Sequence, residues 1–211
     1  MKGESCNSYY QLSDTLKEKQ LVFNGKIWID EYSKVDGDQF LISNVFLNGS
    51  VSMNKITFDR ILLRYDIYKD ELSTINDKGL ILQLNKEMVD SFSLIINESN
   101  LKFIKADSLK GISGYVNVLY PGKTSLYIKY RKNIDLLAVD QKIDRFYQVQ
   151  KNFLLINGIA QPFSGKLEFF RLLDDRKHEL KQFIKKNNIS VSRKNAESFI
   201  PVLRYYDSLI Q

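Results

Sequence analysis

The acidic residues between positions 57 and 72 are the first candidates for chemistry in this sequence. The stretch TFDRILLRYDIYKDEL places four acidic residues and two arginines among large apolar side chains. Acid–base catalysis needs two carboxyl groups that lie close together in environments that separate their pKa values. On one face of a strand, Asp66 and Asp70 would lie about 13 Å apart, farther than either spacing used in glycoside hydrolysis. The sequence therefore predicts a solvated polar face, with Arg64 beside Asp66, and leaves a carboxylate-dependent hydrolase as an alternative.

Other residues that commonly carry catalysis or bind metals are scarce. The chain has one histidine and one cysteine, which excludes nearly all His-triad, thiol-protease and zinc-hydrolase mechanisms. We interpret His178, within the charged run DDRKHELK, as an exposed surface residue, and Cys6 as an exposed thiol in an N-terminal tail. The acidic pair Asp36 and Asp38 lacks the spacing of a calcium loop, and no phosphate-binding glycine motif is present. We therefore predict no catalytic residue, no cofactor and no metal site.

The formal net charge of +6 is mild for 211 residues, but basic residues gather near the C-terminus. Asp174, Asp175 and Glu179 lie among them and dilute their charge. We interpret this region as a solvated helix face, with binding of nucleic acid or anionic lipid as the alternative. The basic residues concerned are Arg171, Arg176, Lys177, Lys181, Lys185, Lys186, Arg193 and Lys194.

Turn signals at short intervals indicate the elements that must position these side chains. Asn-Gly pairs at 24–25, 48–49 and 157–158 favour hairpin turns, and Pro121-Gly122 favours a type II turn. A loop is expected at 76–79. The strand-like runs between the turns are KIWIDEY, LILQL, SFSLII, LKFIKA, GYVNVLY, TSLYIKY and RFYQVQKNFLLI. Many short strands joined by tight turns predict an antiparallel meander: a curved sheet, a half-barrel or a sandwich.

The stretch from 57 to 72 fits both a helix and a strand by periodicity, and its surroundings favour the strand. It follows a hairpin signal and lacks a clear helix start. Apolar residues occupy even positions at 56 and 58 but odd positions from 61 to 67. This change of parity predicts a β-bulge near Asp59 and Arg60.

After residue 163 the apolar period becomes helical. The run from 164 to 188 predicts a helix in one or two pieces, with Ser164 as its N-cap. A second helix is expected from about Ser192, kinked at Pro201 unless it begins nearer Ser198. The simplest organisation is a tail or short helix at 1–19, followed by one β-rich domain at 20–211 whose helices begin at about 164.

Two long stretches resemble uncharacterised exported proteins of Gram-negative bacteria. They are NGSVSMNKITFDRILLRYDIYKDEL, with GLILQL after it, and the closing KHELKQFIKKNNISVSRKNAESFIPVLRYYDSL. The resemblance carries no catalytic motif, and it implies a periplasmic or outer-membrane-associated location. The chain departs from that group because its start lacks the apolar centre of a signal peptide. Separately, no run of the sequence is apolar enough to span a membrane.

Together these observations predict a non-enzymatic binding or interaction protein of the bacterial envelope. Its expected partner is another protein or an apolar small molecule, and contact with a membrane surface is compatible with its charge. A sharper version is a lipid carrier, in which a curved sheet closed by helices holds an apolar ligand. The alternatives are the carboxylate-dependent hydrolase and a nucleic-acid-binding protein.

Overall fold

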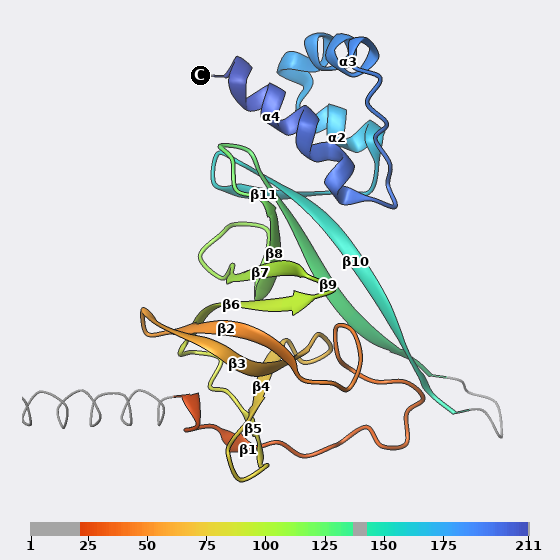
Figure 1. Ribbon diagram of the computed structural model, residues 1–211. Helices are drawn as coiled ribbons and strands as arrows, with labels where there is room; N and C mark the ends of the chain where they lie inside the picture. Colours follow the sequence, from red (N-terminus) through yellow and green to blue (C-terminus); the bar gives the residue numbers. More distant parts are fainter. Residues whose placement is uncertain (1–21, 137–142, 211) are drawn as a thin grey trace, which may run out of the picture. The chain divides into compact units, whose positions relative to one another are not determined.

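The computed structural model describes residues 22–136 and 143–210 (Figure 1). Within these ranges the chain forms eleven strands of an open, mainly antiparallel sheet and three C-terminal α-helices, which confirms the predicted fold class. The predicted tail at 1–19, with Cys6, lies outside the described residues. No helix in the described ranges is long and apolar enough to cross a membrane.

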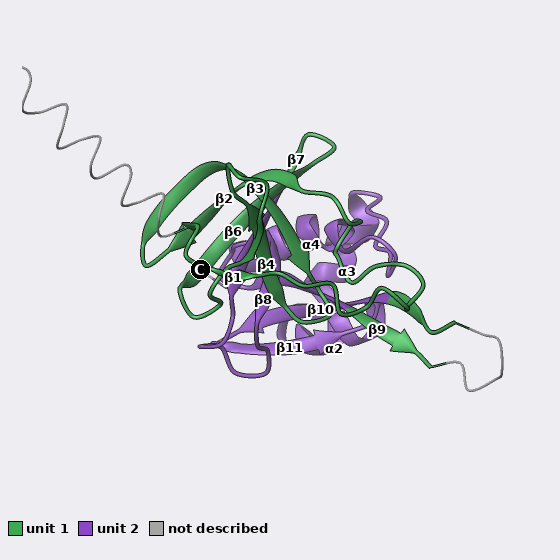
Figure 2. Ribbon diagram, turned by 90° about the horizontal axis from the view of Figure 1, so that it is seen from below, with its two compact units in different colours: residues 1–100, 132–147 green, residues 101–131, 148–211 purple. Residues whose placement is uncertain are grey.

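The chain divides into two compact units, residues 1–100 with 132–147 and residues 101–131 with 148–211 (Figure 2). In the first unit the strands follow the antiparallel order β1-β5-β4-β3-β2-β6. Their bounds are β1 Lys26–Ile27, β2 Leu47–Met53, β3 Ile56–Asp66, β4 Glu71–Ile75, β5 Ile81–Gln83 and β6 Val89–Ile96.

The acidic stretch is extended, as predicted, but it forms a hairpin and not one long strand. β3 ends at Asp66, which pairs with Glu71 at the start of β4, and Asp70 lies in the turn between them at φ 61°. The two aspartates are therefore not neighbours along one strand face. The predicted bulge is confirmed: Gly49 pairs with Ile61 and the next residue of β2 pairs with Asp59, which leaves Arg60 unpaired.

Gly49 lies inside β2, so the turn predicted at Asn48-Gly49 is wrong. The chain reverses instead at Asn54-Lys55, whose φ angles of 49° and 67° fit a tight hairpin turn. Gly49 is needed for space, because a Cβ atom there would overlap the carbonyl oxygen of Ser93 on β6. The turn predicted at Asn157-Gly158 is confirmed.

The second unit contains the remaining strands, in the order β7-β8-β9-β10-β11, and the helices. The strands are β7 Ser99–Lys105, β8 Tyr115–Tyr120, β9 Ser125–Asp135, β10 Arg145–Ile156 and β11 Ile159–Phe163; the start of β7, the end of β9 and the start of β10 belong to the first unit. The helices are α2 Lys166–Leu172, η1 Asp174–Arg176, α3 Lys177–Lys186, η2 Ala196–Phe199 and α4 Ile200–Leu209.

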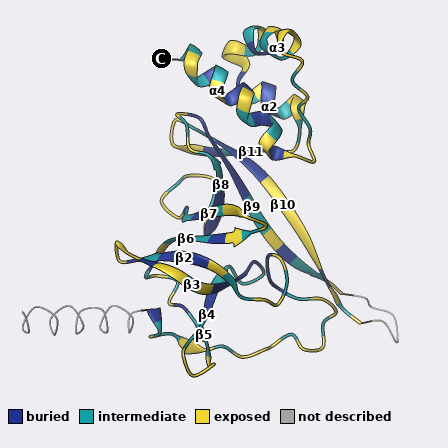
Figure 3. Cartoon of the chain, in the orientation of Figure 1, coloured by how far each residue is buried: buried dark blue, intermediate teal, exposed yellow. Residues whose placement is uncertain are grey.

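The helices of the second unit share a buried core with its strands. The rings of Phe163, Phe169 and Phe199 lie within 5.5 Å of one another, centre to centre, and join β11, α2 and η2. Figure 3 shows buried residues on the inner faces of α2 and α4. Stacked rings of Phe183 and Tyr205, 4.1 Å apart, join α3 to α4.

The helix ends differ from their predicted form. Ser164 does not cap α2; its N–H and Oγ donate to Glu168 Oε2 at 2.6 and 2.8 Å, and Gly165 occupies the cap position. Ser192 does not cap the second helix: Asn195 caps the short turn η2, and Phe199 occupies the cap position of α4. Pro201 lies in the first turn of α4, so the later helix start is confirmed.

An aspartate on α4 anchors the turn between β8 and β9. Asp207 accepts the Thr124 N–H at 3.0 Å and the Tyr120 hydroxyl at 2.9 Å. Gly122 does not adopt the positive φ of the predicted type II turn; a Cβ atom at this position would overlap Asp207. The turn therefore takes its form from a helix more than 80 residues away in the sequence.

Candidate functional site

The polar face of β3 is buried, so the prediction of a solvated face is wrong. Arg64 is 3% exposed and Asp66 is 4% exposed. The segment 39–41, which precedes β2 in the chain, covers them and pairs with the end of β3. The Leu41 N–H donates to the Tyr65 carbonyl, and the Ile67 N–H donates to the Gln39 carbonyl. Such long-range pairing is invisible in the local sequence pattern.

Arg64 lies among aromatic rings. Its guanidinium carbon is 4.3 Å from the ring centre of Trp28, 4.0 Å from Phe40 and 4.7 Å from Phe46, which are cation–π distances. Nε donates to a serine hydroxyl and Nη1 to the Asn44 side chain, while Nη2 is buried with no partner among the described residues. Burial lowers the pKa of Arg64, and nearby Asp66 opposes that shift.

Asp66 has a raised pKa, but its contacts give it a structural role. Burial raises its pKa to about 6, the backbone N–H groups of Lys69 and Tyr68 oppose the shift at 2.8 and 2.9 Å, and Glu71 adds to it. A carboxyl with this pKa can exchange protons near neutral pH. Its oxygen is already used to hold the β3–β4 turn, however, and Asp66 lines neither of the two hollows described below.

The pKa of Asp66 is about 6 in the folded chain, above its ordinary value of 3.8, so the proton on Asp66 stabilises the folded state. This contribution to the free energy of unfolding is present below about pH 4 and is lost as the pH rises through about 6. Asp66→Asn keeps the neutral form at every pH. We expect the variant to equal the natural chain at pH 4 and to exceed its free energy of unfolding by about 1–3 kcal/mol at pH 8. Urea unfolding followed by Trp28 fluorescence measures this difference.

The matched control is Asp59→Asn, an exposed aspartate on the same strand. It should change stability by less than about 0.5 kcal/mol at either pH. An Asp66→Asn variant with the same pH dependence as the natural chain would contradict the assignment.

The remaining acidic candidates are held in hydrogen bonds and ion pairs. Asp70 accepts the Tyr65 hydroxyl at 2.5 Å and forms an ion pair with Lys86 at 2.8 Å. Asp36 pairs with Arg145 and Asp38 with Lys132. Within residues 22–136 and 143–210, no three potential metal ligands of the His, Cys, Asp and Glu types are gathered.

The predicted surface character of α3 and its histidine is borne out. His178 is exposed, and its Nε2 lies 2.9 Å from the Gln182 amide one turn along the helix. Ion pairs between Arg176 and Glu179 and between Lys177 and Asp174 neutralise two of the basic residues. Arg171 and Arg193, two other basic residues of the C-terminal set, line a pocket.

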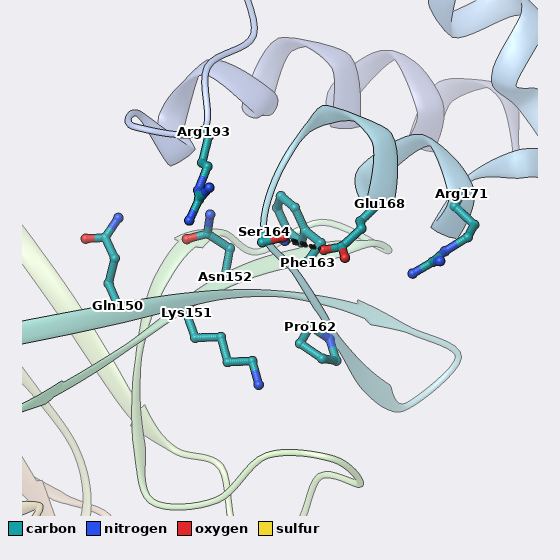
Figure 4. A pocket seen from close by; sticks show the side chains of 9 residues that line it. All are labelled: Gln150, Lys151, Asn152, Pro162, Phe163, Ser164, Glu168, Arg171 and Arg193. Atoms are coloured by element: carbon teal, nitrogen blue, oxygen red, sulfur yellow. Dashed lines mark hydrogen bonds between the residues drawn. The ribbon is translucent and has the colours of Figure 1, made fainter.

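A basic pocket lies in the second unit where β11 ends and the chain turns towards α2 (Figure 4). Its volume is about 530 Å³. The cations Lys151 from β10, Arg171 from α2 and Arg193 from the segment before η2 surround it. The full lining is Gln150, Lys151, Asn152, Pro162, Phe163, Ser164, Glu168, Arg171 and Arg193.

One acidic side chain accompanies the three cations. Hydrogen bonds from Ser164 lower the pKa of Glu168, and the positive charges of Arg171 and Arg193 lower it further. Glu168 is therefore a carboxylate at neutral pH, yet one of its oxygens is already occupied by the two Ser164 donors. The pocket keeps more positive than negative charge.

Asn152 is the most buried polar residue of the basic pocket. It is 6% exposed, and its Oδ1 has no hydrogen-bond partner in the described part of the chain. Figure 4 shows its amide and the Arg193 guanidinium directed towards each other on one side of β10. A buried polar atom without a partner is uncommon and marks a place where a ligand or water completes the bonding.

The sequence pattern favours a solvated helix face for Arg171 and Arg193 and does not indicate the pocket, Lys151 or Asn152 as a site. The one available signal is the polar run from Gln150 to Asn152, directly before the apolar end of the predicted strand. A second hollow, of about 400 Å³, lies beside the bulge of β3 in the first unit. Apolar side chains line much of it, together with Asp59, Arg60 and Asp77.

Comparison with known proteins gives no match: no protein family, no curated protein and no solved structure matches the chain. The likeness to exported proteins of Gram-negative bacteria therefore stays a prediction from the sequence. The case for a function depends on the geometry of the basic pocket.

Proposed function

We propose that this protein is a binding protein and that the basic pocket takes an anionic ligand. The observation that carries this proposal is the gathering of Lys151, Arg171 and Arg193 around one hollow whose single carboxylate is already hydrogen-bonded. An anion bound in this hollow would be attracted by each of these cations.

The residue types indicate the chemistry of the ligand. Arginine presents a planar fork of donors that matches carboxylate and phosphate oxygens, and lysine adds a point charge. The amides of Gln150 and Asn152 supply further donors and acceptors beside the cations. A ligand with a carboxylate or phosphate group and additional hydrogen-bonding groups fits this lining.

The cations surround one hollow and do not form a stripe along the surface. Single-stranded nucleic acid is usually tracked by a long basic groove with aromatic stacking platforms, so the pocket favours a compact anionic group. A lipid carrier and a location in the bacterial envelope stay predictions. The second hollow, with its apolar side chains, is where an apolar ligand would be sought.

Titration with pyrophosphate, followed by calorimetry, tests the proposal. We expect saturable binding that weakens with added salt, and Arg193→Glu should weaken it by about 10- to 100-fold, the loss of one charge-assisted contact. Lys181→Glu reverses an exposed cation on α3 outside the pocket and should change affinity by less than about 3-fold. Absence of saturable binding, or equal effects of the two charge reversals, would contradict the proposal.

A further inference from the structure

The strand beside the basic pocket has an unpaired edge. β10 begins at Arg145, yet β11 pairs with it only from Asn152 to Ile156. From Gln148 to Lys151, β10 has β9 as its neighbour on one side. No strand in the described part of the chain pairs with these four residues on the other side.

The same four residues are exposed on both faces of the strand. Successive side chains of a strand point to opposite faces, and all four of Gln148–Lys151 are exposed. Val149 is a 40% exposed apolar residue on this edge. Figure 3 shows the exposed stretch on β10. The segment is extended beside β9, and no strand within residues 22–136 and 143–210 pairs with its other edge.

The free edge of β11 shows how this chain protects a strand elsewhere. The Ala160 N–H donates to the Lys110 carbonyl at 2.8 Å, and Pro162 removes a backbone donor from the same edge. Proteins usually blunt exposed strand edges with such devices, because a bare edge pairs readily with another chain. Gln148–Lys151 contains no proline, its four residues are exposed in the described part of the chain, and its one charged residue, Lys151, lines the basic pocket.

We propose that an extended acidic segment of a partner protein pairs with β10 along Gln148–Lys151 and places its carboxylates in the basic pocket. This inference rests on the proposed anion-binding function and adds the identity of the anion's carrier. The pocket begins where β11 stops: Asn152 pairs with Phe163, the last residue of β11, and Ser164 then leaves the sheet. An added strand would lie beside β10 where β11 no longer pairs with it. The addition of a peptide strand to an exposed sheet edge is a known mode of recognition.

The arrangement of the cations predicts the pattern of the peptide. Figure 4 shows Arg193 on one side of β10 and Lys151 directed to the other side. Consecutive residues of a paired strand also point to opposite faces, so two adjacent acidic residues reach both cations at once. Flanking β-branched residues favour the extended form. The ligand class is therefore an extended segment with a central pair of acidic residues.

Fluorescence anisotropy with the labelled peptide TVEEVT, acetylated and amidated, tests this pairing. We expect saturable binding to the full chain, weakened about 10- to 100-fold in TVQQVT, where both carboxylates become amides. Methylation of the peptide's backbone nitrogens removes strand pairing without changing charge, and should weaken binding at least 10-fold. Arg193→Glu should weaken binding of the parent peptide, and Lys181→Glu should not.

Hydrogen exchange separates strand pairing from simple anion binding. The parent peptide should slow amide exchange within Gln148–Lys151 by about 10-fold or more, because pairing protects the backbone. Pyrophosphate should not slow it. If the methylated peptide binds as well as the parent, or if exchange is unchanged at saturation, the pocket takes small anions only and the inference is wrong while the proposed function stands.

Two further outcomes also overturn the inference. Failure of both pyrophosphate and peptide to bind removes the proposed function together with it. Protection of Gln148–Lys151 that rises with protein concentration alone, measured alongside sedimentation, would show that a second copy of the chain occupies the edge. Sedimentation as a monomer, with protection only when the peptide is present, supports the acidic partner.

Discussion

Replacing Phe169 with alanine is expected to lower the free energy of unfolding of the second unit by about 3–5 kcal/mol. Phe169 is fully buried, and its ring lies 5.5 Å from that of Phe163, 5.4 Å from Phe170 and 4.6 Å from Phe199. The substitution removes the ring on which α2, η2 and β11 converge. The cavity that remains cannot close without moving three elements.

Urea unfolding followed by circular dichroism at 222 nm measures this loss, because the described α-helices all lie in the second unit. Leu167→Ala is the matched control on the same helix: Leu167 is 90% exposed, and its truncation should cost less than about 0.5 kcal/mol. A loss below about 1 kcal/mol for Phe169→Ala would show that this ring cluster does not hold the helices.

Replacing Arg64 with alanine is expected to lower the stability of the first unit by about 2–4 kcal/mol. The long side chain fills the space between Trp28, Phe40 and Phe46, so truncation loses both packing and the cation–π contacts. It also leaves the Asn44 side chain without its donor. Urea unfolding followed by Trp28, the single tryptophan of the chain, reports directly on this site.

Methionine at position 64 separates packing from charge. Arg64→Met keeps most of the volume but removes a desolvated charge and a donor, Nη2, that has no partner in the described residues. Replacing a buried charge with an apolar side chain of similar size is often neutral, so we expect a change within about 1 kcal/mol. Arg60→Met, at an exposed arginine of the same strand, is the control. A methionine variant as unstable as the alanine variant would show that the charge itself stabilises the unit.

Much of the strand pattern is written locally and could be predicted. The run RFYQVQKNFLLI becomes β10 with the same two ends, and the change of apolar parity correctly indicates the bulge at Arg60. The predicted helical run after residue 163 forms two α-helices, one of the two forms that the sequence allowed, with the short turn η1 between them. These features follow from turn chemistry and side-chain periodicity, which depend on neighbours within a few residues.

The candidate sites could not be predicted in the same way. Arg64 and Asp66 read as a solvated face because their cover, the segment 39–41, is attached through backbone bonds that leave no side-chain pattern. The Asn-Gly pair at 48–49 predicted a turn. In the structure, Gly49 is needed because β6 approaches its backbone too closely for a side chain.

Local sequence patterns alone were enough to predict most of the extended segments and the helical region after residue 163, and the sequence contains no conventional catalytic or nucleotide-binding motif. The folded chain brings together Lys151, Arg171 and Arg193, which are far apart in the sequence, around one pocket. This pocket lies beside a stretch of β10 that no strand within the described residues pairs on one edge. The two kinds of information differ in range. Periodicity and turn preferences act between near neighbours, whereas burial and charge clustering depend on which distant segments the sheet and helices bring together.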